Sequence, residues 1–75
     1  LQGTIQLVDM RVPELVIHTE SATRRVRLGP MTVIVIAGMP ATASELRPGQ
    51  RVAVQLHVTG GGVVRDLAAR IVVLR

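Results

Sequence analysis

Apolar and polar residues alternate most regularly over residues 52–58. One side of an extended chain there carries Val52, Val54, Leu56 and Val58. The opposite side carries Ala53, Gln55 and His57. A strand with one apolar face requires a sheet that closes or stacks over that face. This segment therefore predicts a strand that borders the core of a barrel or sandwich.

The residues before this strand predict a short helical turn followed by a tight turn. Thr42 and Glu45 have the spacing of a capping box, in which the two side chains pair with free backbone amides at a helix start. Pro48 presets φ for the first corner of a β-turn, and Gly49 accepts the positive φ that the second corner requires.

Further strands are predicted over 3–8, 14–20, 24–28, 31–37 and 63–74. In the first of these, Ile5 and Leu7 are expected on one face. Gly29-Pro30 is expected to interrupt the chain between 24–28 and 31–37, and the apolar run 31–37 is typical of a strand covered on both faces. Residues 38–41 are predicted as a turn.

The last segment, 63–74, also fits helical spacing. Its β-branched end and the preceding Gly60-Gly61-Gly62 favour a strand that follows a hairpin, with Leu67, Ala69, Ile71 and Val73 on one side.

Five or six strands with one helical turn between the third long strand and the fourth predict an all-β fold, a small OB-like Greek-key β-barrel. Closure of the barrel removes the exposed edges that so valine-rich a chain would otherwise offer to other chains. Seventy-five residues predict a single domain over 1–75, near the lower limit for a stable core.

Composition excludes several kinds of site. The chain has no cysteine, so thiolate metal sites and disulfides are excluded. All nine basic residues are arginine against five acids, and this balance weakly favours anionic partners. No apolar run reaches the length of a membrane-spanning helix. Because the chain begins at Leu1, we expect an excised domain or a processed product.

Several groups of residues occur in an order that resembles a known family. They are Gly3-Thr4-Ile5, Leu15-Val16-Ile17-His18, Pro30-Met31-Thr32-Val33, the run from Ser44 to Val52, and the run from Asp66 to Val72. This order resembles the CusF-like domains, small periplasmic OB-type barrels that carry copper(I) and silver(I). Such domains occur alone as metallochaperones or fused to adaptor proteins of heavy-metal efflux pumps. The resemblance therefore implies a periplasmic location and an efflux-pump adaptor or transporter as partner.

The family binds metal through a histidine on the second strand, a Met-x-Met pair on the third and a nearby tryptophan. Thioether sulfur and imidazole suit soft monovalent ions. Carried over, the resemblance implies His18 and Met31 as copper(I) or silver(I) ligands. Val33 stands at the second methionine, and the chain contains no tryptophan. Met10, Met39 and His57 are further candidate ligands.

Two other classes of function are considered as alternatives to the metal hypothesis. A structural or protein-interaction module that has lost metal binding predicts a contiguous exposed aliphatic patch. An OB-type nucleic-acid binder predicts that four arginines converge on one groove, namely Arg24, Arg25, Arg27 and Arg51. The absence of aromatic side chains disfavours the nucleic-acid class. A metal carrier predicts that His18 and Met31 share one face at the same end of the barrel.

No arrangement of residues indicates an enzyme. Gly60-Gly61-Gly62 is not followed by the lysine of a phosphate-binding loop. Thr42 and Ser44 are better explained as caps of the helical turn than as nucleophiles. We therefore predict a non-catalytic protein.

Overall fold

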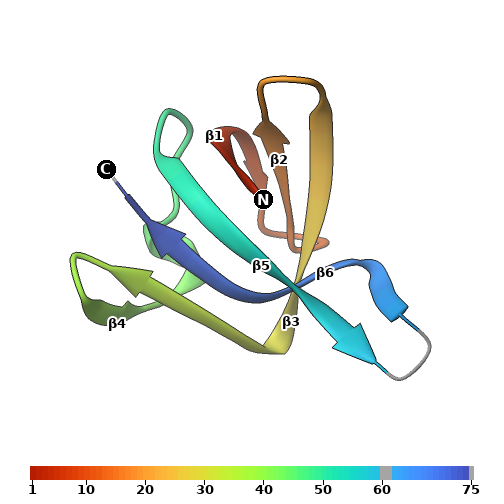
Figure 1. The fold of residues 1–75 in the computed structure, drawn as a ribbon. Helices are drawn as coiled ribbons and strands as arrows, with labels where there is room; N and C mark the ends of the chain where they lie inside the picture. Colours follow the sequence, from red (N-terminus) through yellow and green to blue (C-terminus); the bar gives the residue numbers. More distant parts are fainter. Residues whose placement is uncertain (60–61, 75) are drawn as a thin grey trace.

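The computed structural model describes residues 1–59 and 62–74, and for residues 58, 59 and 62–66 only the backbone is considered. Its elements are β1 (Gln2–Asp9), β2 (Glu14–His18), β3 (Thr23–Ile36), β4 (Met39–Ala41), η1 (Ala43–Glu45), β5 (Arg51–Thr59) and β6 (Gly62–Val73). Figure 1 shows strands wrapped around one interior, with the short η1 beside the sheet.

Five of the six strands close a ring in the order β1, β2, β3, β6, β5. Neighbouring strands run antiparallel except β3 and β6, which pair in parallel, and β4 extends the sheet outside the ring. This closed ring confirms the predicted all-β, OB-like barrel. As expected of a closed ring, few strand edges are left unpaired.

The regular alternation of β5 places its apolar side in the core, as predicted. Val52 and Val54 are buried, whereas Arg51 and Gln55 are exposed. Inward-facing residues of every ring strand complete the core together with one residue beyond η1. The buried set is Ile5, Leu15, Ile17, Val26, Leu28, Ile34, Leu46, Val52, Val54, Ala68 and Ile71.

The prediction that Ile5 and Leu7 share a face is wrong. The register of β1 against β2 shifts between Ile5 and Leu7. A bulge of this kind inserts one residue and reverses the sides of all that follow. Ile5 is therefore buried, Leu7 is 54% exposed, and Val8 packs against the core instead.

The expected break at Gly29-Pro30 is a bend within one strand. β3 runs through both residues, and its register against β6 shifts between Leu28 and Val33. Figure 1 shows the resulting change of direction in the middle of β3. The run 31–37 is consequently not covered on both faces, since Met31 and Val33 are exposed.

A two-residue turn joins β3 to β4, so residues 39–41 form a strand rather than the predicted turn. Ala37 and Gly38 both have positive φ, 53° and 77°. Two central residues with positive φ define the hairpin turn whose twist matches the flanking strands.

The predicted cap and turn before β5 are present. The backbone N–H of Thr42 donates to Glu45 Oε2 at 2.8 Å, as the capping-box spacing predicts. Gly49 has φ of 95°, and Gln50 N donates to Arg47 O at 3.3 Å across the Pro48-Gly49 turn. Gly49 N also donates to Ile5 O at 2.8 Å, which ties this turn to β1.

β6 is a strand, as predicted, and not a helix. Its register against β5 shifts near Ala69, so Ala68 and Ile71 are buried while Ala69 is only partly so. Thr59 pairs with Gly62. The predicted connection residues Gly60 and Gly61 lie outside the described residues.

Candidate functional site

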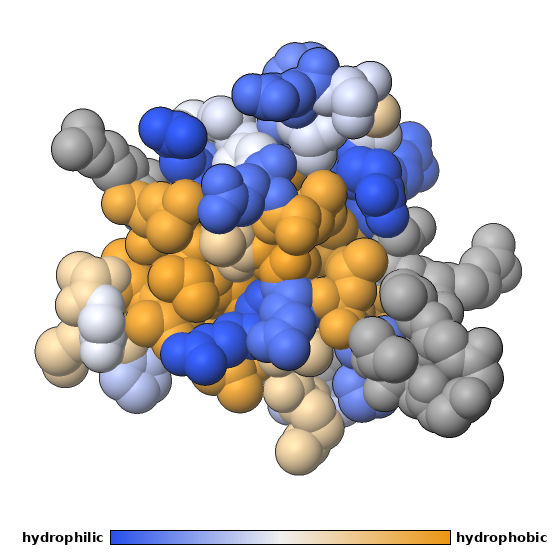
Figure 2. Space-filling model, in the orientation of Figure 1, coloured by the Kyte–Doolittle hydropathy of each residue, from blue (hydrophilic) through white to orange (hydrophobic). Residues whose placement is uncertain are grey.

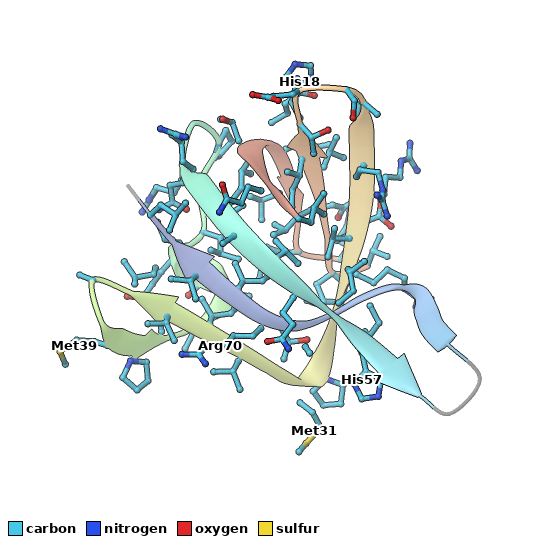
Figure 3. The ribbon with its side chains drawn as sticks, viewed as in Figure 1. His18, Met31, Met39, His57 and Arg70 are labelled. Atoms are coloured by element: carbon cyan, nitrogen blue, oxygen red, sulfur yellow. The ribbon has the colours of Figure 1, made fainter. Side chains whose placement is uncertain are left out.

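His18 and Met31 lie at opposite ends of the barrel (Figure 3). His18 is the last residue of β2 and pairs with Thr23 of β3. From Thr23 to Leu28, before its bend, β3 advances roughly 16 Å away from His18 at about 3.3 Å per residue, and Met31 lies beyond that point. A single ion cannot contact both side chains in this arrangement, so the expected grouping at one end is not found. Metal binding by either residue alone stays a prediction.

The turn between β2 and β3 explains this separation. Thr19 N donates to Ala22 O at 2.8 Å, and Ala22 N donates to Thr19 Oγ1 at 3.1 Å. The tight turn returns β3 directly along β2, with Leu15 opposite Val26. Met31 therefore passes the beginning of β2 and lies beyond it.

His18 lines a cleft of about 700 Å³ at the end of the barrel. The first residues of β1, the β2–β3 turn, Arg24 and Arg51 form its other walls. Two guanidinium groups against one carboxylate, that of Glu20, give this cleft an excess of positive charge. Like charges repel, so the surroundings of His18 favour an anion over a metal cation.

Met31 occupies the bend of β3 and is 87% exposed. One hydroxyl group holds this bend. Thr32 Oγ1 accepts from Gly29 N at 2.9 Å and donates to Ala68 O at 2.6 Å. The bend directs the Met31 thioether into solvent, where a soft ion could reach it without displacing core atoms.

The other candidate ligands do not complete a site around His18. Met39 and Met10 are exposed in β4 and after β1, and His57 is exposed on β5. Figure 3 shows Met31, Met39 and His57 away from His18. Among the described side chains, those of residues 1–57 and 67–74, no group of three or more His, Cys, Asp or Glu could hold a metal ion.

The four arginines of the nucleic-acid hypothesis do not converge on one groove. Arg24 and Arg51 line the His18 cleft. Arg25 and Arg27 flank the buried Val26, so they face away from the interior. Arg25 Nη1 lies 3.8 Å from Glu14 Oε1, on the outside of the barrel.

Sequence reasoning did not single out Arg70, which is exposed on the outside of β6 (Figure 3). The signal was available, because the alternation that turns Ile71 inward must turn Arg70 and Val72 outward. The space-filling view shows apolar side chains gathered over β3, β5 and β6 on this side of the molecule (Figure 2).

A membrane-crossing helix, one of sufficient length and apolar character, is absent from the part of the chain that the structure describes.

Comparisons with known proteins identify the fold. No protein-family model matches this sequence, and no curated protein matches it. A copper(II)-bound variant of CusF from Escherichia coli superposes with a TM-score of 0.68 at 21% identity, over 99% of this chain and 88% of that one. Silver(I)-bound CusF superposes with a TM-score of 0.64 at 21% identity, over 96% of this chain and 91% of that one. This chain therefore has a CusF-like fold.

Proposed function

We propose that this chain is an accessory domain of a copper or silver efflux system. It binds soft monovalent ions in the periplasm and passes them to an adaptor or transporter protein of the pump. The observation that carries the proposal is the accessible Met31 thioether, 87% exposed on the strand where CusF-like domains hold their methionines. The likeness in fold to the copper- and silver-bearing CusF structures supports it.

Met31 is the proposed primary ligand. Thioether sulfur is polarizable and suits copper(I) or silver(I). Val33 is the next residue on the same side of β3 and is 51% exposed, but it offers no donor atom. One thioether holds an ion weakly, so ligands of the receiving protein would complete the coordination during transfer. We propose a non-catalytic carrier role on this basis, in which the ion is held weakly enough to be passed on.

His18 is proposed as a separate and weaker ligand. Its imidazole is exposed, but Arg24 and Arg51 line the same cleft and lower the local affinity for a cation. Its distance from Met31 makes the two residues independent in this proposal.

A silver(I) titration of protein labelled at backbone amides and methionine methyl groups tests the proposal by NMR. We expect saturable shifts of the Met31 methyl signal and of the backbone amide signals around it, and the amide shifts should be lost in Met31→Leu. Met39→Leu is the matched control, because Met39 is also an exposed strand methionine, at 66%. That variant should retain the Met31 shift.

His18→Ala distinguishes independent ligands from a shared site. The Met31 shift should persist in this variant, since no single ion reaches both residues. Loss of the Met31 shift in His18→Ala would contradict the independence of the two ligands. A titration without saturable shifts at Met31 would refute the soft-metal role.

A further inference from the structure

The outside of the sheet formed by β3, β6 and β5 presents aliphatic side chains around one arginine. We call this surface the outer face and define it by Val33, Val35, Ala53, Arg70 and Val72. Each of these residues neighbours a buried one along its strand, namely Ile34, Val54 or Ile71, so each points outward.

Strand register brings these residues together. Val35 pairs with Val72, and Val72 pairs in turn with Ala53, which makes a row of apolar side chains across three strands. Arg70 occupies the next row, between Val33 of β3 and Gln55 of β5. Residues directly opposite on adjacent strands have Cβ atoms about 5 Å apart, so the surface is continuous. Figure 2 shows the apolar band, broken by a hydrophilic group where Figure 3 places Arg70.

Among the side chains that the structure describes, no carboxylate lies on this face beside the Arg70 guanidinium. The Arg70 side chain makes no hydrogen bond or ion pair within the described part of the chain. The carboxylates whose side chains are described lie on other elements: Asp9 at the end of β1, Glu14 in β2, Glu20 after β2 and Glu45 in η1. Asp9 and Glu14 pair with other arginines.

A shallow depression of about 320 Å³ adjoins Arg70. Ala53 and Val72 contribute apolar walls, and Arg70 and Gln55 contribute polar groups. An aliphatic side chain that ends in, or neighbours, a carboxylate matches this lining. Apolar surface that remains accessible is typical of interaction sites, and here Val33 is exposed while Val35, Ala53 and Val72 are half-buried. Arginine is enriched among the residues that dominate binding energy at protein interfaces.

We infer that the outer face docks a partner protein whose surface is aliphatic and carries a carboxylate that pairs with Arg70. This inference uses neither Met31 nor His18 as a contact residue, so it does not rest on the soft-metal proposal.

Charge favours such a partner over a second copy of this chain. A symmetric dimer places the same patch on both subunits. Contact centred on the outer face would therefore bring two Arg70 guanidinium groups together, with no carboxylate among the described side chains of this face between them.

Addition of a partner strand to the sheet edge is opposed by Pro40. The outermost strand is β4, where Pro40 pairs with Val35 and the neighbouring Met39 pairs with Ile36 across the turn. In an antiparallel ladder the residue after a hydrogen-bonded pair directs its backbone nitrogen away from its neighbour. At that outward position Pro40 has no N–H to donate, so the edge is a poor template.

Methyl-labelled protein titrated with two short peptides tests the inference. The first is a five-residue aliphatic peptide with a central glutamate, and the second has glutamine in its place. We expect saturable shifts of the Val33, Val35 and Val72 methyl signals with the glutamate peptide. The glutamine peptide should bind about tenfold more weakly, because a charge-assisted contact is lost.

Arg70→Gln should weaken the glutamate peptide by the same factor and leave the glutamine peptide unchanged. Arg11→Gln is the control, since it removes the same charge from a side chain that is 94% exposed in another region. Val33→Ser should also weaken binding of both peptides. Leu7→Ser is its matched control, with 54% exposure against 51% for Val33.

Equal affinities for the two peptides, full affinity in Arg70→Gln, or no saturable shift on the outer face would each overturn the inference. Concentration-dependent shifts of the same methyl signals without peptide would also overturn it, because they would identify a second copy as the occupant.

Discussion

The two regions that hold the predicted metal ligands are built in opposite ways. At the His18 end, backbones pack so closely that an added Cβ at Gly3 would lie 2.5 Å from His18 O and 2.6 Å from Ile17 Cγ2. At the bend of β3, one threonine hydroxyl holds the backbone, and Met31 extends into solvent. The close packing at the His18 end contributes to the stability of the barrel. At the bend, Met31 can contact other molecules without disturbing the core.

The largest expected change in stability comes from a substitution that disrupts the packing at the His18 end. Gly3→Ala should lower the free energy of unfolding by about 3 kcal/mol, because the new methyl group must push backbone and core atoms apart. Chemical denaturation measures this change. Gly29→Ala is the control at the bend, where the nearest atom is Leu67 Cδ1 at 3.1 Å, the end of a flexible side chain. Equal losses in the two variants would contradict the contrast.

An intermediate change in stability is expected from a substitution at the bend of β3. Thr32→Val should lower the free energy of unfolding by about 1 to 2 kcal/mol, because it removes an acceptor for Gly29 N and a donor to Ala68 O. Thr32→Ser retains the hydroxyl and should recover most of this stability. Thr23→Val, at an exposed position of the same strand, is the control and should be nearly neutral. A neutral Thr32→Val would show that the hydroxyl does not hold the bend.

The smallest effect has the opposite sign and lies beyond the bend. Ala37 adopts the left-handed conformation with φ of 53°, which is costly for alanine. Ala37→Asn should raise the free energy of unfolding by about 0.5 kcal/mol, since Asn-Gly is the preferred sequence for this turn. Thermal unfolding measures the gain. Ala22→Asn, in a turn without positive φ, should show no such gain, and an equal gain there would point to another cause.

Sequence patterns predicted the fold where the register is regular. The alternation of β5 identified its buried side because Val52 and Val54 meet a single core. Bulges in β1 and β6 were not predicted, since alternation assumes that each residue reverses the side of the one before. The prediction also treated β3 as two strands separated at Gly29-Pro30. In the structure, hydrogen bonds through Thr32 keep the strand continuous there.

The candidate site was harder to predict than the fold. A resemblance in residue order suggested that His18 and Met31 meet, but their distance depends on where β3 turns back along β2. That position is set by hydrogen bonds of Thr19 and Ala22, which no pattern of apolar residues encodes. Arg70 was overlooked because its importance arises from Val33 and Gln55, neighbours that are distant in sequence.

The parallel pairing of β3 with β6 has a kinetic consequence. β6 lies between β3 and β5, so the ring stays open until this last strand is in place. Arg27 pairs with Leu67, and Ile36 pairs with Val73. These contacts join residues that are far apart in the chain. Closing such long loops costs entropy before any contact compensates for it, which slows folding. During synthesis on the ribosome, the earlier strands would therefore keep their valine-rich faces exposed to solvent until β6 has emerged and can pair.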